Sequence, residues 1–452
     1  MHLFASVNKR EAATLFAGDI VIFYISLWLM LLVRYVRAPG DELVVSHIAP
    51  FSILFIAWLI VFFIAGLYEK HTIILKGKLP TVIFNAQVVN SALAVLFFYL
   101  IPYFGITPKT NLFIYLVISF GLVVLWRVRV YPFLSPRTRQ RGILIGSGSE
   151  MHELKEEVNN NSRYALEFVS SIDLDEMEGV DFREEIVNRI YSEEITTVVV
   201  DTQNEKVAPI LPVLYNLIFS KVRFIDMHRV YEDIFDRVPL SLVQYSWFLE
   251  NVSTTSKFTY DFLKRMMDIL IAFPLALISL VTFPFVWFAI WLEDKNQLFV
   301  VQDRIGKNNR MVRLRKFRTM TGSDSGDEVL QSRQHVTRVG KFLRKSRIDE
   351  LPQLWSVVKG DLSLIGPRPE LPALVKKYEQ DVSFYNVRHL IKPGLSGWAQ
   401  IYHHAHPHHG ANVDETKVKL SYDLYYIKNR SFLLDLKIAL RTVQTLLSRV
   451  GV

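Results

Sequence analysis

The stretch RKSRIDELPQLWSVVKGDLSLIGPRPE, residues 344–370, sets two adjacent carboxylates, Asp349 and Glu350, among several basic side chains. A proline has no amide hydrogen and is tolerated only in the first turn of a helix, so Pro352 predicts a helix that begins near Asp349 and ends at Gly360. Free amide groups and the positive end of the helix dipole favour a carboxylate or a bound phosphate at such a start. The stretch therefore predicts either a site for a phosphorylated substrate or an ordinary helix cap.

The composition around this stretch is typical of a membrane protein. Half of the 452 residues are hydrophobic, and the length predicts two or three domains. The absence of cysteine excludes disulfides, cysteine-ligated zinc and a thiol nucleophile. The net charge of +8 fits contact with anionic lipid or phosphorylated ligands. Because much of the basic excess flanks apolar segments, we do not expect a nucleic-acid partner.

Four apolar segments dominate the first 135 residues, and each approaches the ~20 residues that a helix needs to cross a bilayer. They are residues 12–33, 48–67, 82–100 and 112–126. Basic residues precede the first segment, separate the second from the third and follow the fourth, although Arg34 and Arg37 lie on the opposite side. The positive-inside rule thus places both ends in the cytoplasm. We expect a four-helix transmembrane bundle over residues 1–135.

Residues 136–255 have the composition of a soluble domain. An apolar strand runs into a glycine turn, GILIGSGS, over residues 142–149, and further strands over 196–201 and 222–226 alternate with helical stretches. The third glycine of a dinucleotide-binding fingerprint falls on Met151, whose large side chain obstructs the close helix approach that the motif needs. We expect a degenerate Rossmann-like α/β domain with a structural or regulatory role, and a bound nicotinamide cofactor as the alternative.

A fifth apolar run, residues 269–292, follows the motif KRMMD and contains Pro274 and Pro284. Its length would allow a crossing, but both flanks are basic, so the charge rule selects no direction. A helix that enters the bilayer, breaks at Pro284 and returns to the same face satisfies both observations, provided that the freed carbonyl groups find partners. We therefore expect a re-entrant membrane helix over residues 266–292 and a cytoplasmic domain over residues 256–452.

Further charged segments lie in this last domain. Arg368 stands between Pro367 and Pro369, which fix the backbone and would hold its guanidinium for a two-bonded contact with a phosphate. The alternative is a surface arginine in a proline-rich turn. Residues 403–409 contain five histidines, but no carboxylate or thiol at metal spacing, so we do not expect a zinc site there. Residues 431–450 have the pattern of an amphipathic helix that lies in a membrane interface.

Six motifs occur in order over residues 264–429: KRMMD, RKFRTM, RIDELPQLW, KGDLSLIGPRP, KPGLSGWAQ and YDLYYIKN. Together they resemble the bacterial polyprenyl-phosphate glycosylphosphotransferases, also called monotopic phosphoglycosyl transferases. The four N-terminal segments and the α/β domain are similar to the long form of that family, which initiates exopolysaccharide, capsule or O-antigen synthesis. The resemblance implies a membrane protein with a four-helix transmembrane bundle, a Rossmann-like domain, and an α/β catalytic domain that carries a re-entrant helix and interfacial amphipathic helices.

The resemblance also implies a reaction. Family members move a sugar 1-phosphate from a UDP-sugar, here a hexose such as glucose or galactose, to undecaprenyl phosphate at the cytoplasmic face of the bacterial inner membrane, and they release UMP. The aspartate of the Asp–Glu pair is the nucleophile that forms an aspartyl phosphosugar, and Mg²⁺ assists. These roles map onto Asp349, as nucleophile and metal ligand, with Glu350 beside it. The candidate substrate-binding residues, all basic, are Lys316, Arg318, Arg344 and Arg368.

One segment departs from the family pattern, because the histidine-rich stretch stands where many relatives carry an Asn-Gly loop. The transferred sugar therefore stays open, as does a homodimer. Three other functions also remain: a glycosyltransferase that moves only the sugar, a membrane-anchored nucleotide-sugar oxidoreductase or dehydratase, and a non-catalytic scaffold for polysaccharide assembly. The weak glycine motif disfavours the oxidoreductase, and the basic and acidic cluster disfavours the scaffold.

Overall fold

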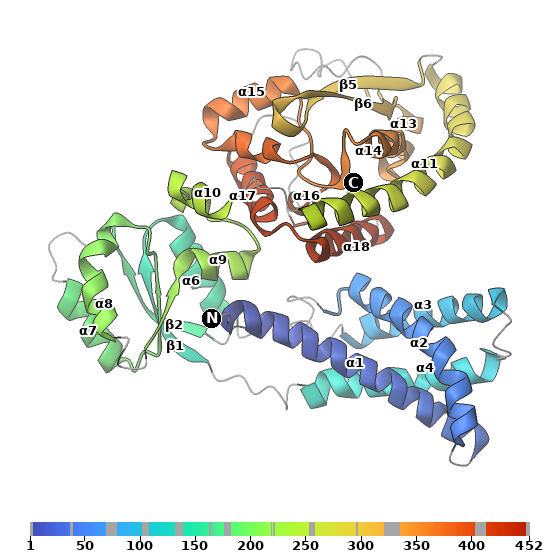
Figure 1. Ribbon diagram of the computed structural model, residues 1–452, viewed down its shortest axis with the longest axis horizontal. Coiled ribbons are helices and arrows are strands. Elements are labelled where there is room, and N and C mark those ends of the chain that lie inside the picture. Colours follow the sequence, from blue (N-terminus) through green and yellow to red (C-terminus); the bar gives the residue numbers. More distant parts are fainter. Residues whose placement is uncertain are drawn as a thin grey trace.

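The computed structural model shows three parts: a group of long helices, a small α/β domain and a C-terminal domain built on one long helix (Figure 1). The described residues are 3–36, 39–68, 79–101, 108–131, 139–161, 164, 166–175, 182–217, 219, 222–252, 258–294, 297–320, 335–402 and 413–448. The histidine-rich stretch of residues 403–409 lies outside them.

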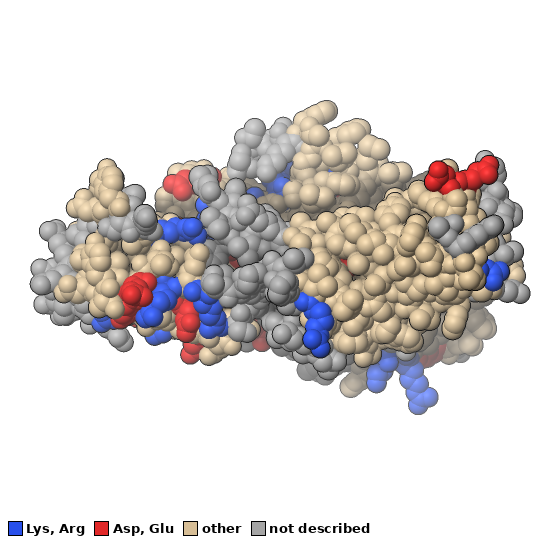
Figure 2. All heavy atoms as spheres, turned by 90° about the horizontal axis from the view of Figure 1, so that it is seen from below, with Lys and Arg blue, Asp and Glu red and all other residues tan. Residues whose placement is uncertain are grey.

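The four N-terminal helices pack around one hydrophobic core that includes Phe23, Phe51 and Trp58. They are α1 (Leu3–Tyr35), α2 (Asp41–Ile64), α3 (Leu79–Leu100) and α4 (Pro108–Leu125), which a π-helical turn (Trp126–Val130) extends. Each is long and apolar enough to cross a membrane. Figure 2 shows the surface over these helices as a broad area with few charged side chains, whereas the α/β domain beside it carries both signs. Such a surface suits lipid contact, and its orientation in the membrane stays a prediction.

A buried ion pair joins the first and last of these helices. Arg127 binds the Asp19 carboxylate through Nε and Nη2 and donates from Nη1 to the carbonyl oxygen of Leu67 (2.6 Å). The Tyr68 hydroxyl donates to the same carboxylate (2.8 Å). Charges inside a membrane protein are tolerated when they face the helix interior and are paired in this way. The pair therefore fixes how α1 and α4 meet.

The α/β domain is a doubly wound parallel sheet with the strand order β2-β1-β3-β4. Its strands are β1 (Gln140–Gly146), β2 (Leu166–Asp173), β3 (Thr197–Val200) and β4 (Arg223–Asp226). Separate apolar clusters fill its two faces under α6 (Ser149–Asn160), α7 (Phe182–Ser192), α8 (Leu211–Leu217) and α9 (Met227–Phe235). The predicted strands are present, and β2 is an additional one. Met151, at the third glycine position of the fingerprint, lies on α6 and is buried.

The C-terminal domain combines a hairpin, a short parallel strand pair and several helices. Its early elements are α11 (Phe258–Asp294), the antiparallel pair β5 (Phe299–Ile305) and β6 (Met311–Phe317), α13 (Arg338–Lys345), the 3-10 helix η7 (Ile348–Gln353) and α14 (Leu354–Lys359). Its later elements are the parallel strands β7 (Ser363–Ile365) and β8 (Gly394–Ser396), α15 (Pro372–Asp381), η8 (Tyr385–Leu390), α16 (Trp398–Tyr402), α17 (Val413–Asn429) and α18 (Phe432–Ser448).

The expected break of the membrane helix at Pro284 is absent. Helix α11 continues for 37 residues through Pro274 and Pro284, and Figure 1 shows that it bends along its course. A proline inside a helix bends it without ending it when the carbonyl groups nearby find other donors. The carbonyl group that loses its donor at Pro284 is that of Leu280, four residues earlier. Just before Pro284, the hydroxyls of Ser279 and Thr282 donate to the carbonyl oxygens of Ala276 and Ser279, both at 2.7 Å. The return of this helix to the same membrane face stays a prediction.

Helix α9 attaches the α/β domain to the C-terminal domain. Lys428 on α17 donates to both carboxylate oxygens of Glu232 (2.8 and 2.9 Å). The indole of Trp398 donates to the carbonyl oxygen of Asp236 (2.8 Å), directly after α9. Since Trp398 and Glu232 are both buried, the two domains share part of one interior.

Candidate active site

The chain turns sharply on both sides of the Asp349–Glu350 pair. Arg347 adopts a left-handed conformation (φ 57°) between α13 and η7, and Gly360 (φ 95°) ends α14. The helical extent from Asp349 to Gly360 was predicted, but its first part is a 3-10 helix. Pro352 has no amide hydrogen to donate to the carbonyl group of Ile348, and short 3-10 turns are common at the start of an α-helix.

Glu350 is held by two arginines. Nη2 of Arg368 donates to its Oε1 (2.7 Å), and Nη1 of Arg347 lies 3.7 Å from its Oε2. Burial alone would raise the pKa of Glu350, but the charges of Arg368 and Arg347 hold this pKa below its usual value. Glu350 is therefore an ionised acceptor that fixes the Arg368 guanidinium.

Asp349 differs from Glu350 in its contacts and in the direction of its pKa shift. Its half-buried carboxylate accepts no hydrogen bond and forms no ion pair among the residues that the structure describes. Burial and the adjacent charge of Glu350 raise its pKa to about 6, while Lys316, Arg344 and Arg347 oppose that rise. A carboxylate with an elevated pKa and free lone pairs is a better nucleophile than one that ion pairs neutralise.

Three of the four predicted basic residues surround the pair. Lys316 on β6 and Arg344 on α13 both lower the pKa of Asp349 through their charges, and Arg368 contacts Glu350. The Nε of Arg344 donates a hydrogen bond to the Thr319 hydroxyl (2.9 Å), which orients the guanidinium. Arg318 instead donates to the carbonyl oxygen of Met320 (3.2 Å), so its role in substrate binding stays a prediction.

A buried ionic network behind Arg368 was not predicted. Arg388 forms an ion pair with Asp423 (2.8 Å) and donates from Nη2 to the carbonyl oxygen of Arg368 (3.0 Å). Glu370 is paired with Lys419 and lies 3.8 Å from Arg388. Although burial raises the pKa of Glu370, Lys419 and Arg388 lower it to about 2. This network fixes the turn that carries Arg368, and only the fold brings its members together.

The carboxylates of the site decide whether it could hold Mg²⁺. Among the described residues, no three His, Asp or Glu side chains are arranged to hold a metal ion. Magnesium, however, is commonly bound by one or two carboxylates together with substrate phosphates and water. Asp349 accepts no hydrogen bond from any residue that the structure describes and fits the role of a single protein ligand of this kind, whereas Glu350 is occupied by arginines.

Known proteins share this part of the chain. The family described as "Bacterial sugar transferase" matches residues 259–449. The UDP-N-acetylgalactosamine-undecaprenyl-phosphate N-acetylgalactosaminephosphotransferase of Aeromonas hydrophila is 43% identical over 202 residues, which cover 42% of this chain and 45% of that protein. The chain thus spans less than half of the length of that relative.

Two further relatives extend the comparison. The UDP-glucose:undecaprenyl-phosphate glucose-1-phosphate transferase of Caulobacter vibrioides is 36% identical over 191 residues, which cover 42% of this chain and 71% of that protein. The undecaprenyl-phosphate glucose phosphotransferase of Komagataeibacter xylinus is 27% identical over 403 residues, which cover 83% of this chain and 72% of that protein. The match over residues 259–449 and the extensive coverage of the Caulobacter relative show that the chain belongs to the bacterial sugar transferase family.

Proposed function

We propose that the protein transfers a sugar 1-phosphate from a UDP-sugar to undecaprenyl phosphate and releases UMP. The observation that supports this most directly is Asp349, a carboxylate with a pKa of about 6 that has no hydrogen-bond partner in the described part of the chain and is placed among basic side chains. The relatives named above act on UDP-N-acetylgalactosamine, UDP-glucose and undecaprenyl phosphate, as their names state. We propose a hexose such as glucose or galactose as the sugar, and the first membrane step of exopolysaccharide, capsule or O-antigen synthesis as the context.

In the first step, an Asp349 oxygen attacks the β-phosphorus of the UDP-sugar. A bond forms between this oxygen and the phosphorus, and the bond from the phosphorus to the oxygen that bridges the two phosphates breaks. UMP leaves with that oxygen, and the sugar phosphate remains on Asp349 as an acyl phosphate. The charges of Lys316 and Arg344, which already act on Asp349, would stabilise the negative charge that develops on the phosphoryl oxygens.

In the second step, a phosphate oxygen of undecaprenyl phosphate attacks the same phosphorus. The bond from the phosphorus to Asp349 breaks, the carboxylate is restored, and the product is a lipid-linked diphosphate sugar. Arg368, fixed by Glu350 on its side chain and by Arg388 on its carbonyl group, would orient a phosphate with charge-assisted hydrogen bonds. Dividing the transfer allows a soluble donor and a lipid acceptor to use one site in turn.

Mg²⁺ is part of the proposal. Asp349 would be its protein ligand, and the ion would supply charge neutralisation at the diphosphate. The membrane position is also proposed: the bent helix α11 and the amphipathic helix α18, with Leu433 and Val443 exposed, would hold the site at the cytoplasmic face of the bacterial inner membrane.

The test is to incubate the purified full chain with a panel of UDP-sugars, with and without undecaprenyl phosphate. We expect UMP as the released nucleotide, and a sugar phosphate covalently trapped on the protein when the acceptor is omitted. Release of UDP as the nucleotide product would contradict the mechanism and would favour a transferase that moves only the sugar.

A further inference from the structure

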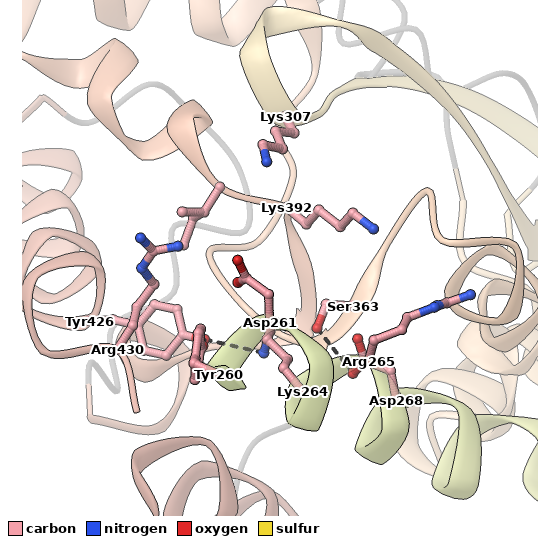
Figure 3. A pocket seen from close by; sticks show the side chains of 11 residues that line it. Tyr260, Asp261, Lys264, Arg265, Asp268, Lys307, Ser363, Lys392, Tyr426 and Arg430 are labelled. Carbon is pink, nitrogen blue, oxygen red and sulfur yellow. Dashed lines mark hydrogen bonds between the residues drawn. The ribbon is translucent and has the colours of Figure 1, made fainter. Parts of the chain in front are cut away.

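A second basic site lies apart from Asp349. A cavity of about 270 Å³ opens beside the first turns of α11 and is lined by five cationic side chains and two carboxylates among the described residues (Figure 3). Asp349 and the basic residues around it do not line this cavity. Arg265, which does, donates to the carbonyl oxygens of Val357 and Val358 at the far end of α14 (both 2.7 Å). The cavity and Asp349 therefore lie at opposite ends of the segment formed by η7 and α14.

Some of the charges at the cavity are already compensated. Lys264 forms an ion pair with the buried Asp435 (3.0 Å), which also accepts a hydrogen bond from Tyr260 (2.9 Å). Asp268 accepts hydrogen bonds from the Ser363 hydroxyl (3.1 Å) and the Leu364 amide (2.9 Å). These contacts are structural, since they attach α11 to α18 and to β7.

Two of the remaining cations have no such partners. The ammonium groups of Lys307 and Lys392 form no hydrogen bond or ion pair with the side chains or backbone that the structure describes. Lys392 and Arg265 lie close together, because both approach Gly360. The Lys392 ammonium and the Arg265 guanidinium would each lie 3.6 Å from a Cβ atom placed on that glycine. Burial, followed by the charges of Arg265 and Lys307, lowers the pKa of Lys392, while Asp268 and Asp361 oppose this shift. Figure 3 shows Lys307 and Lys392 across the opening from the α11 residues.

The position of the cavity indicates where an anion would come from. The lining residues of α11 end at Asp268, directly before the apolar run in which Leu270 is 66% exposed and Val281 is 68% exposed. Arg430, another lining residue, lies two residues before the start of the amphipathic helix α18. With α11 inserted as proposed, a basic cavity at the foot of its apolar run would lie at the level of lipid phosphate groups, where each cation adds attraction to an anionic surface.

We propose that this cavity binds the phosphate group of an anionic lipid headgroup, at a site separate from Asp349, with Lys392, Lys307 and Arg265 as its ligands. The inference goes beyond the transfer reaction, because it concerns how the chain engages the bilayer. A bound phosphate would relieve the repulsion between Lys392 and Arg265 and would tie the start of α11 to the membrane surface. Free inorganic phosphate shares the same chemistry, so the experiment must separate the two sources.

The test measures the unfolding midpoint of the full chain in detergent micelles during titration with one of three probes. They are dihexanoyl phosphatidylglycerol, inorganic phosphate, and dihexanoylglycerol, which has the same chains without the phosphate. A ligand that binds only the folded state raises the midpoint, and the concentration dependence gives the dissociation constant. We expect phosphatidylglycerol to raise the midpoint and dihexanoylglycerol to leave it unchanged.

The variants are Lys392→Gln and Lys307→Gln, with Lys377→Gln on the exposed side of α15 as a control that removes the same charge elsewhere. We expect each cavity variant to weaken phosphatidylglycerol binding about tenfold, the scale of one charge-assisted contact, and the control to match the unsubstituted chain. A response to phosphatidylglycerol alone assigns the site to lipid. An equal response to inorganic phosphate supports a phosphate site that is also filled from solution. The proposal is overturned if the cavity variants behave like Lys377→Gln, or if dihexanoylglycerol acts like phosphatidylglycerol.

Discussion

The ionisation of Asp349 gives a quantitative prediction for the first half-reaction. With a pKa of about 6, about one carboxylate in eleven is ionised at pH 5 and about ten in eleven at pH 7. If the ionised form is the nucleophile, the rate of UMP release without acceptor lipid should therefore rise about tenfold between these pH values. An aspartate with its ordinary pKa would already be ionised at pH 5, and its rate would stay nearly constant.

Two substitutions should move this pH profile in opposite directions. Arg344 lowers the pKa of Asp349, so Arg344→Gln should shift the rising limb to higher pH by about one unit. Glu350 raises the same pKa, so Glu350→Gln should shift the limb to lower pH by a similar amount. The opposite signs are informative because a general loss of structure would not produce them.

The assay is a single-turnover measurement of UMP release from the UDP-sugar in the absence of undecaprenyl phosphate. Omitting the lipid matters because its phosphate monoester also titrates near pH 6, whereas the diphosphate of the donor does not. A flat profile for the unsubstituted chain, or shifts of the same sign in both variants, would refute the assignment of Asp349 as the titrating nucleophile.

The remaining predictions concern the same residues and the membrane helix. Asp349→Asn should abolish both UMP release and covalent trapping, and retained turnover would reduce Asp349 to a helix cap. Above pH 6 the unfolding midpoint of this variant should equal or exceed that of the unsubstituted chain, because the raised pKa of Asp349 means that the fold favours a neutral group at this position. Arg368→Ala should lower kcat/KM by about 10- to 100-fold, the scale of a charged hydrogen bond worth about 1.5–3 kcal/mol, and unchanged kinetics would remove Arg368 from the site. Single cysteines at Glu250 and Gln297, on either side of α11, should both resist an impermeant reagent in intact cells and react once the membrane is opened; labelling of Gln297→Cys alone from outside would indicate a true crossing.

The parts of the fold that could be predicted have local signals. Apolar runs of sufficient length indicated the membrane helices, and Pro352 and Gly360 bounded the helical segment of the site because each acts on its own backbone. Strand β2 was missed, because it is an edge strand whose inward and outward residues alternate, so its sequence, LEFVSSID, lacks the continuous apolar character of the central strands.

The parts that could not be predicted depend on partners far apart in the sequence. Arg388 carries no local signal, and only the fold places it between Asp423 and the carbonyl group of Arg368. Likewise, Pro284 alone indicated a break in α11. The helix instead continues through both prolines. Whether a proline ends a helix or only bends it depends on the packing around it, which a sequence does not state.

The buried pair of Asp19 and Arg127 also has a consequence for biogenesis. Arg127 follows Asp19 by 108 residues, and a ribosome adds about 5–20 residues per second, so roughly 5 to 20 seconds separate the synthesis of the two partners. During that interval the Asp19 carboxylate on the first helix has no guanidinium with which to form its ion pair. A nascent chain that stops before Arg127 therefore presents an unmatched acid to the insertion machinery, and we expect such truncated products to be degraded sooner than chains that have completed the fourth helix.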